Sequence, residues 1–277
     1  MLCIDDETYS LLSKINFNHV ILITLNELKD DSIIKLRKER KLNEFCWTLK
    51  PIFIESLLCN YYSLERITFI DSDLYFFSNP TIIFENQPTS SVLLSCSDVY
   101  VPSFSPIING LVEDLTGKYN SGFISFKNDL TSKLFLKSWK VKCIERCSDN
   151  IDNNSFGDQK YLDTLPYTFE NISSISTPGV NIGHWNYARY KFHILDGMCF
   201  IDKSKLICYH FSGFRIVSKT QIFQLYEFNR IDFPFIYSFY KNVIKDIIVD
   251  IEQIDPYFNG FSTEGNMSTC IIKLNKP

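Results

Sequence analysis

The chain is poor in the residues that define several common protein classes. Its 277 residues include only four histidines and three tryptophans, and its nine cysteines contain no C-x-x-C pair. An odd number of cysteines, most of them inside apolar segments, argues against a disulfide framework and favours a reducing compartment. The small number of histidines argues against a multi-histidine metal site.

Long apolar runs and an excess of basic charge are also absent. No stretch reaches the ~18 to 20 consecutive apolar residues that cross a bilayer, and the N-terminus has neither a basic region nor a long apolar core. The net charge is −4, and the basic run 35–41 is interleaved with acidic and apolar residues. This pattern argues against a nucleic-acid partner. The composition predicts a soluble cytoplasmic protein with no transmembrane segment and no secretion signal.

The remaining composition, 45% hydrophobic and 22% charged, is that of a globular chain with a sizeable core. Apolar strand-like runs alternate with segments of helical periodicity, which predicts an α/β fold with a sheet flanked by helices. We expect one domain over residues 1–215 and an aromatic-rich appendage over residues 216–277, helical around 223–229 and 235–247. Within the domain, strands are expected over residues 20–25, 67–70, 91–96, 120–126 and 206–210, and helices over residues 28–42, 48–61 and 129–147.

The most informative segment is the apolar strand 67–70 followed by Asp71, Ser72 and Asp73. Side chains two apart in an extended chain point the same way, so both carboxylates are expected on one side at the carboxyl end of a strand buried on both faces. Hard oxygen ligands hold Mg²⁺ or Mn²⁺ and leave coordination positions open for substrate phosphates. A capping or turn role is the alternative for acidic residues at a strand end.

Two further polar residues stand at the ends of predicted elements. Asp158 is the first residue of a short helix expected over 158–162, where the helix dipole favours an acid and capping is its ordinary role. His210 ends an apolar strand just before the turn at Gly213, where a lone histidine usually has a structural role.

Five segments resemble segments of a known protein family and occur in the same order as in that family, a likeness that composition alone does not reveal. The chain resembles nucleotide-diphospho-sugar glycosyltransferases of the GT-A fold, in particular the family 8 type and its bacterial polysaccharide-associated relatives. The resemblance covers roughly residues 1 to 215. The matching segments are residues 45–51, 68–77, 119–123, 156–162 and 209–213.

The resemblance implies a metal site and a donor site. Asp71, Asp73 and His210 would hold Mn²⁺ or Mg²⁺ against the diphosphate of a nucleotide sugar, with a UDP-sugar favoured as donor. The acceptor would be a saccharide or a lipid-linked saccharide. The aromatic-rich appendage could equally bind a partner or a lipid-linked acceptor at a membrane surface, and in the second case the enzyme would be peripheral to the membrane. The residues that would contact the donor are Lys50, Ser72, Ser121, Gly122, Gly213 and Arg215.

The same resemblance implies catalytic roles for Asn120, Asp158 and Gln159. Asn120 would serve hydroxyls of the transferred sugar, with strand-entry turn chemistry as its alternative role. Asp158 would orient a hydroxyl, stabilise the transition state or act as a base. Family 8 implies retention, in which the leaving phosphate takes the acceptor proton, whereas inversion would need Asp158 as the base. Trp185 would stack on a sugar, and core packing is its alternative.

One departure from the family pattern concerns the start of the chain. The family begins with a strand and helix that precede a segment like residues 2–9 and contact the nucleotide. By this resemblance about one βα unit of ~30 residues is missing, and its strand would pair beside the Asp71 strand.

Three functions therefore stay open. The first is a metal-dependent glycosyltransferase. The second is a non-catalytic nucleotide- or sugar-binding derivative of the same fold, and the third is a phosphohydrolase of the haloacid dehalogenase type, whose nucleophile and acid also form a D-x-D motif.

Overall fold

The chain divides into two compact units, residues 25–210 and residues 1–24 with 211–277. None of the described helices is both long and apolar enough to cross a membrane. The structure, a computed structural model, describes residues 1–151, 155–224, 235–262 and 271–273.

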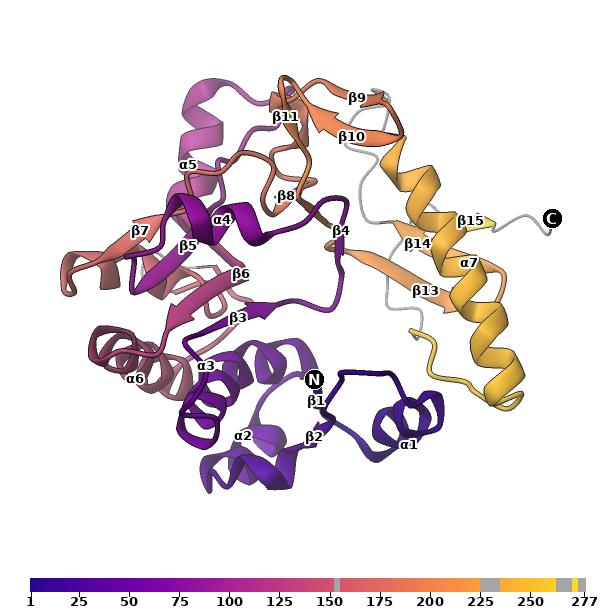
Figure 1. Ribbon diagram of the computed structural model, residues 1–277, viewed down its shortest axis with the longest axis horizontal. Coiled ribbons are helices and arrows are strands. Elements are labelled where there is room, and N and C mark those ends of the chain that lie inside the picture. The colour runs from indigo at the N-terminus through magenta and orange to yellow at the C-terminus, as the bar shows by residue number, and fades with distance from the viewer. Residues whose placement is uncertain (152–154, 225–234, 263–270, 274–277) are drawn as a thin grey trace. The chain divides into compact units, whose positions relative to one another are not determined.

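The unit of residues 25–210 is built on a mixed sheet with strand order β3-β6-β5-β7 (Figure 1). The strand β6 is antiparallel to both of its neighbours, and β7 is parallel to β5. The outer strand β3 is half-buried rather than covered on both faces, because among the described strands it pairs with β6 alone and Ile70 is exposed. The strands are β3 (Arg66–Ile70), β6 (Tyr119–Lys127), β5 (Val92–Cys96) and β7 (Ile172–Ser174).

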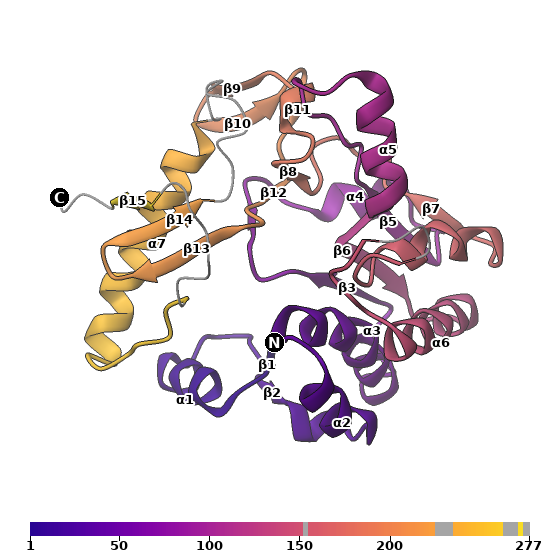
Figure 2. The same cartoon turned by 180° about the vertical axis from the view of Figure 1, so that it is seen from behind.

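Helices α3 (Leu42–Asn60) and α6 (Leu130–Glu145) pack against each other beside this sheet (Figures 1 and 2). Apolar side chains from both helices and from β6 form the main core, in which Phe126 and Trp139 are fully buried with stacked rings 6.2 Å apart. Burial of each such side chain contributes about 1.5–3 kcal/mol. The core therefore fixes the sheet on one side and leaves its strand ends to carry polar residues.

A smaller sheet joins segments that are far apart in the sequence. In it β12 is antiparallel to β4 and parallel to β8, and His210 pairs with Leu74. This register places the end of β12 beside the turn that follows β3. The strands are β4 (Leu74–Phe76), β12 (Cys208–His210) and β8 (Ile182–Gly183).

The other elements of this unit lie around the two sheets. A two-residue turn, Asp196 and Gly197, joins β9 to β10, and both residues have positive φ as a tight hairpin requires. The elements are η1 (Leu25–Leu28), α2 (Ser32–Glu39), α4 (Thr81–Asn86), α5 (Pro106–Thr116), η2 (Lys160–Asp163), η3 (Leu165–Tyr167), η4 (Tyr187–Arg189), β9 (Phe192–Leu195), β10 (Met198–Ile201) and β11 (Ser204–Lys205).

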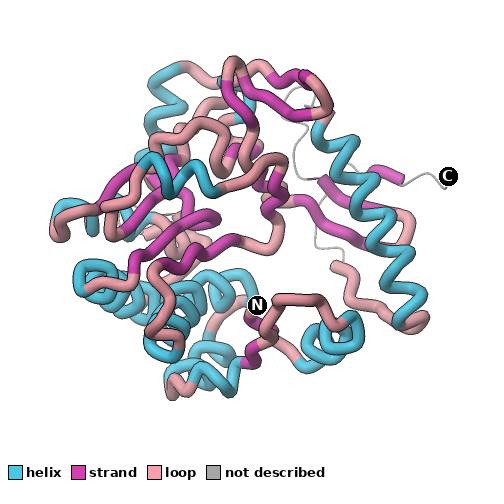
Figure 3. Tube along the Cα trace, in the orientation of Figure 1, coloured by secondary structure: helices cyan, strands magenta, loops and turns pink. Residues whose placement is uncertain are grey.

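The second unit contains two short parallel strands and an antiparallel sheet with a long helix (Figure 3). Asp5 caps α1 by accepting a hydrogen bond from the Thr8 backbone N–H. The ring of Phe211 stacks on Tyr240 of α7 with centroids 3.7 Å apart. The elements are β1 (Leu2–Cys3), α1 (Asp6–Ile15), β2 (Ile23–Thr24), β13 (Phe214–Ser218), β14 (Gln221–Gln224), α7 (Ile236–Ile254) and β15 (Ile271–Lys273).

Several predicted elements differ from the structure at their ends. The strand predicted over 20–25 is confined to β2, and the helix predicted over 28–42 is confined to α2. The helix predicted over 48–61 starts six residues earlier, where the Glu44 side chain accepts the Lys41 backbone N–H at 3.3 Å. Pro51 consequently lies in the helix interior, not in its first turn.

The appendage is helical where residues 235–247 predicted it, in α7, but it also contains β13 to β15. Of the helix predicted around 223–229, residues 223 and 224 belong to β14 instead, and 225–229 lie outside the described residues. The predicted boundary after residue 215 stays a prediction.

Candidate functional site

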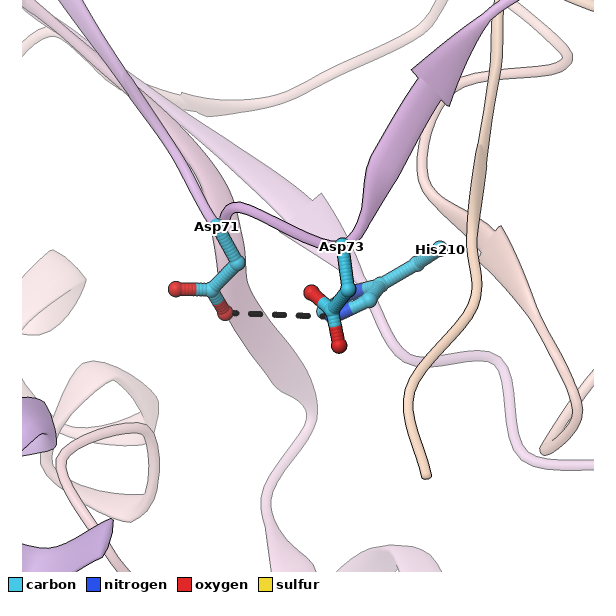
Figure 4. A group of neighbouring side chains, drawn as sticks. All are labelled: Asp71, Asp73 and His210. Atoms are coloured by element: carbon cyan, nitrogen blue, oxygen red, sulfur yellow. Dashed lines mark ion pairs between the residues drawn. The ribbon is translucent and has the colours of Figure 1, made fainter. Parts of the chain in front are cut away.

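Three predicted metal ligands converge in the unit of residues 25–210. The Nε2 atom of His210 lies 2.9 Å from Asp73 Oδ1 and 3.9 Å from Asp71 Oδ2. One potential ligand atom from each of the three residues lies within 4.8 Å of the others. Figure 4 shows the imidazole and the two carboxylates directed at the same small volume.

The local geometry that brings the two carboxylates together differs from the predicted one. The chain turns after β3 instead of continuing as an extended strand, and the Leu74 backbone N–H donates to the Asp71 carbonyl at 3.2 Å. The Asp71 backbone N–H in turn donates to the Gly122 carbonyl at 2.9 Å. The turn therefore sets the separation of Asp71 and Asp73, and β6 anchors its first residue.

The donor set suits a hard divalent cation. The two carboxylates are ligands that Mg²⁺ and Mn²⁺ prefer, and the imidazole nitrogen, which is typical of transition-metal sites, favours Mn²⁺ of the two. Burial alone would raise the pKa of Asp73, but the interactions with His210, a backbone hydrogen bond and the Lys50 charge together outweigh burial and lower the pKa. Asp73 is therefore favoured in the ionised form that binds a metal.

A buried lysine lies behind the carboxylates. Lys50, on α3, places Nζ 3.0 Å from Asp71 Oδ2, 3.5 Å from Asp158 Oδ2 and 3.0 Å from Ser121 Oγ. Burial alone would lower the pKa of the ammonium, but the carboxylates of Asp158 and Asp71 outweigh it and raise the pKa. The charged form of Lys50 is therefore favoured, and its ammonium contacts Asp71, Asp158 and Ser121.

Asp158 is buried on the same side of the site. Its backbone carbonyl accepts the Trp139 indole N–H at 2.8 Å, which fixes the loop that carries it. Burial raises the pKa of Asp158, an effect that the Lys50 charge opposes and the Asp71 charge reinforces. The Ser121 hydroxyl hydrogen-bonds to the same carboxylate. Ser121 therefore lies between Lys50 and Asp158.

The predicted catalytic amides are engaged with the protein. Asn120 Oδ1 accepts from the Gly122 backbone N–H and from Asn181 Nδ2, each at 2.9 Å. Gln159 Oε1 lies 3.4 Å from Asn120 Nδ2, and Gln159 Nε2 donates to the Thr116 carbonyl at 2.7 Å. Their predicted contacts with the sugar stay predictions.

Sequence reasoning did not single out Asn181. Its side chain is fully buried and its Oδ1 lies 3.0 Å from His210 Nδ1. No sequence pattern pointed to it; in the structure its φ of 55° is the left-handed conformation, for which asparagine is enriched.

Gly122 and Trp185 pack against the His210 imidazole. A Cβ added at Gly122 would lie 2.4 Å from His210 Cε1, so only glycine leaves room for the ring. The Trp185 ring meets the imidazole edge-on, with centroids 5.3 Å apart and planes at 86°. It also covers Gly183, where an added Cβ would lie 2.3 Å from the indole. Stacking of Trp185 on a sugar stays a prediction.

The other predicted donor contacts have different settings. Ser72 is exposed in the turn between the two aspartates. Gly213 has φ of 79°, which fits the predicted glycine turn, and Arg215 is exposed on β13. These last two residues belong to the other compact unit, and their contacts with a donor stay predictions.

Comparison with known proteins decides the family. A family model described as nucleotide-diphospho-sugar transferase matches residues 1–224. The chain belongs to this family. Membership in the nucleotide-diphospho-sugar transferase family, together with the mixed sheet and its flanking helices, confirms the predicted fold class. This family membership gives no support to the alternative of a haloacid dehalogenase-type phosphohydrolase.

Two relatives of this nucleotide-diphospho-sugar transferase come from Bacillus subtilis (strain 168). The uncharacterized protein YfnF is 44% identical over 265 residues, covering 95% of this chain and 88% of its own length. The uncharacterized protein YfnD is 33% identical over 268 residues, covering 94% and 84%. Both relatives match nearly the whole chain, and their names carry no activity.

One solved structure is also similar. It is the crystal structure of a glycosyltransferase involved in the glycosylation of the major capsid of PBCV-1, at 12% identity and a TM-score of 0.38, covering 75% of this chain and 84% of that chain. A likeness this distant carries no argument about the site.

Proposed function

We propose that this protein is a metal-dependent glycosyltransferase that moves a sugar from a nucleotide-diphosphate donor, a UDP-sugar, to a hydroxyl of a saccharide or lipid-linked acceptor. The observation that carries the proposal is the convergence of Asp71, Asp73 and His210 in a chain of the nucleotide-diphospho-sugar transferase family. Mn²⁺ or Mg²⁺ held there would stabilise the charge that develops on the departing nucleoside diphosphate.

The protein groups around the site support this role. Lys50 sets a fixed positive charge against Asp71 and Asp158, which limits the repulsion between buried carboxylates in the absence of the cation. The Asp71 backbone is anchored to β6 and His210 to β4, so the turn that carries the two aspartates and the strand that carries His210 are each held by a sheet. A site of this kind is organised before the donor binds.

Retention is the stereochemical course that the burial of Asp158 favours. An inverting enzyme needs a carboxylate that can reach the acceptor hydroxyl and take its proton. Asp158 is only 3% exposed and pairs with Lys50. In the retaining course, the bond from the anomeric carbon to the phosphate oxygen breaks, the acceptor oxygen bonds to that carbon on the same face, and the leaving phosphate takes the acceptor proton.

The remaining assignments extend this proposal along the donor and acceptor. Trp185 would stack on a sugar, and membership of family 8, a cytoplasmic location and a role in polysaccharide biosynthesis rest on the resemblance of the motifs. The residues that we assign to the donor are Lys50, Ser72, Ser121, Gly122, Gly213 and Arg215, with Asn120, Asp158 and Gln159 beside the transferred sugar.

The decisive experiment compares the wild type, Asp71→Ala and Asp114→Ala. Asp114 is an exposed aspartate on α5 and serves as the matched control. We would measure the melting temperature with UDP or GDP, each with and without Mn²⁺, because a ligand bound only to the native state raises it by mass action. Release of nucleoside diphosphate from a panel of nucleotide sugars would then measure turnover.

We expect a shift with UDP that requires Mn²⁺, is lost in Asp71→Ala and is kept in Asp114→Ala. Turnover should follow the same pattern. A metal-dependent shift without turnover of any donor would favour a non-catalytic nucleotide-binding protein. A shift retained by Asp71→Ala would show that the nucleotide binds without the proposed metal site.

A further inference from the structure

A chain of side-chain amides determines which nitrogen of His210 carries hydrogen. It starts at the Gly122 backbone N–H, which can only donate, so the Asn120 atom 2.9 Å away must be oxygen. That same oxygen lies 2.9 Å from the Asn181 amide, which must therefore present its nitrogen. The Asn181 oxygen then faces His210 Nδ1 at 3.0 Å.

The other end of this series of hydrogen-bonded amides gives the same orientation. The Thr116 backbone carbonyl can only accept, so the Gln159 atom 2.7 Å away must be the amide nitrogen. This leaves the Gln159 oxygen facing Asn120 Nδ2 at 3.4 Å. Two backbone groups therefore orient all three amides in one direction. A flip of any one amide would set two donors or two acceptors against each other.

The orientation of these amides determines which His210 nitrogen faces the candidate metal site with its lone pair available. Because Asn181 Oδ1 is an acceptor, the His210 nitrogen that faces it must carry hydrogen. Nε2, the nitrogen directed at Asp71 and Asp73, donates to the Asp73 carboxylate 2.9 Å away when it carries hydrogen, and it offers a lone pair to a metal that replaces that hydrogen. Metal ligation by histidine generally uses such a partner on the second nitrogen to set the tautomer and the ring orientation.

We propose that Asn181 is a positioning residue that holds His210 as the Nδ1–H tautomer and presents Nε2 to the metal; the catalytic meaning of this role rests on the proposed function. The surroundings support it. Asn181 is fully buried, and its backbone N–H donates to Cys208 Sγ at 3.2 Å on the strand that carries His210. The imidazole is also confined by Gly122 and by the Trp185 ring.

The tautomer can be observed directly by long-range ¹H–¹⁵N NMR of ¹⁵N-histidine protein at pH 9 with excess Mg²⁺, a diamagnetic ion that would replace the hydrogen between Nε2 and Asp73. The chain has only four histidines, and His210→Gln assigns the signal of interest. We expect the wild type to show hydrogen on Nδ1 and a bare Nε2. In Asn181→Gly this preference should be lost, whereas Asn181→Asp, which keeps an oxygen facing Nδ1, should restore it. Protonation of Nε2 in the wild type, or an unchanged spectrum in Asn181→Gly, would overturn the proposal.

Asn171→Gly controls for the backbone. Asn181 and Asn171 have φ of 55° and 60°, and glycine accepts this conformation without strain. Asn171 is exposed and contacts the β5 strand through its carbonyl. Its replacement should leave the His210 signal unchanged, so a change that appears in both variants would point to a general structural effect and against the proposal.

Affinity for Mn²⁺ alone, measured by electron paramagnetic resonance of the free ion, is the second readout. We expect Asn181→Gly to bind about 10- to 100-fold more weakly than the wild type, as loss of a partner behind a metal ligand typically causes. Asn171→Gly should bind as the wild type does. Equal affinity in wild type and Asn181→Gly would refute the positioning role. A wild type that binds no Mn²⁺ yet shows the expected tautomer would refute the proposed function and leave the tautomer assignment standing.

Discussion

Two lysines in the unit of residues 25–210 each lie between two carboxylates, but at different depths. The side chain of Lys50 is 6% exposed and that of Lys140 is 21% exposed. The ion-pair distances are shorter around Lys140, 2.7 and 2.6 Å, than around Lys50, 3.0 and 3.5 Å. Distance alone would rank Lys140 as the more important residue. Burial reverses the ranking, because removing one partner of a buried pair leaves a charge that solvent cannot stabilise.

The two clusters also differ in what they join. Lys140 on α6 contacts Asp30, before α2, and Glu55 on α3, so it links surface elements around the core. Lys50 contacts Asp71 and Asp158, both of which belong to the candidate site. The same arrangement of charges therefore stabilises a surface in one place and organises a site in the other.

Lys50→Met should have the largest effect. Because it leaves the Asp71 and Asp158 carboxylates without their cation, we expect a loss of about 3–5 kcal/mol in the free energy of unfolding. Urea unfolding of the wild type and the variant measures it, with turnover assayed below the transition. Turnover should be lost as well, since the Asp71 ligand is no longer held. A loss no larger than that of Lys140→Met would contradict the role of burial.

The double variant Lys50→Met/Asp158→Asn sharpens the comparison. Burial raises the pKa of Asp158, so its ionised form is already disfavoured, and a neutral amide of similar shape relieves the unpaired charge. We expect the double variant to be more stable than Lys50→Met by about 1–3 kcal/mol, the range of coupling between residues in contact. Turnover should stay lost. A strictly additive cycle would show that the two side chains are not coupled.

The sequence predicted the grouping of the three candidate metal ligands better than their local geometry. Asp71 and Asp73 stood out because an apolar strand precedes them, whereas His210 joined them only through the family resemblance. No local pattern connects His210 with these residues, because pairing of β12 with β4 brings them together. The predicted extended geometry was wrong, since a turn contributes as much as strand periodicity to the direction of the carboxylates.

The burial of Lys50 and the contacts of Asn181 were beyond sequence reasoning for a related reason. A lysine in a helix next to Pro51 gives no sign of its burial, because that burial depends on carboxylates contributed by the turn after β3 and by the loop at Asp158. Asparagine is common at left-handed positions whether or not its amide is engaged. Long core elements such as α6 were predicted well, because their apolar periodicity reflects a single large core.

Lys140→Met tests the less deeply buried side of the comparison. Solvent and salt screen the two carboxylates that it leaves, so we expect a loss of only about 1 kcal/mol in the free energy of unfolding despite the short distances. Urea unfolding at low and at high salt would measure it. The loss should shrink in high salt, and turnover should match the wild type. A loss of several kcal/mol would mean that distance matters more than depth.

Asp30→Asn should have the smallest effect and a defined dependence on pH. Burial alone would raise the pKa of Asp30, but hydrogen bonds from Lys140 and Ser32 outweigh it and hold the pKa below its ordinary value. A carboxyl whose pKa is lower in the folded state stabilises the fold above its unfolded pKa of about 3.9, and this stabilisation is lost as the pH falls through the folded pKa.

The wild type should therefore exceed Asp30→Asn in stability by about 0.5–1 kcal/mol at pH 7, and the gap should close in strongly acidic solution. Urea unfolding from pH 7 down to the acid limit of the fold measures the gap at each pH. Asp31→Asn is the matched control, because the neighbouring Asp31 is exposed and its side chain makes no capping hydrogen bond. A gap that stays constant with pH would mean that Asp30 contributes through shape and hydrogen bonding rather than through its charge. The comparison of the Lys140 cluster with the buried Lys50 cluster would then no longer be one between two electrostatic clusters.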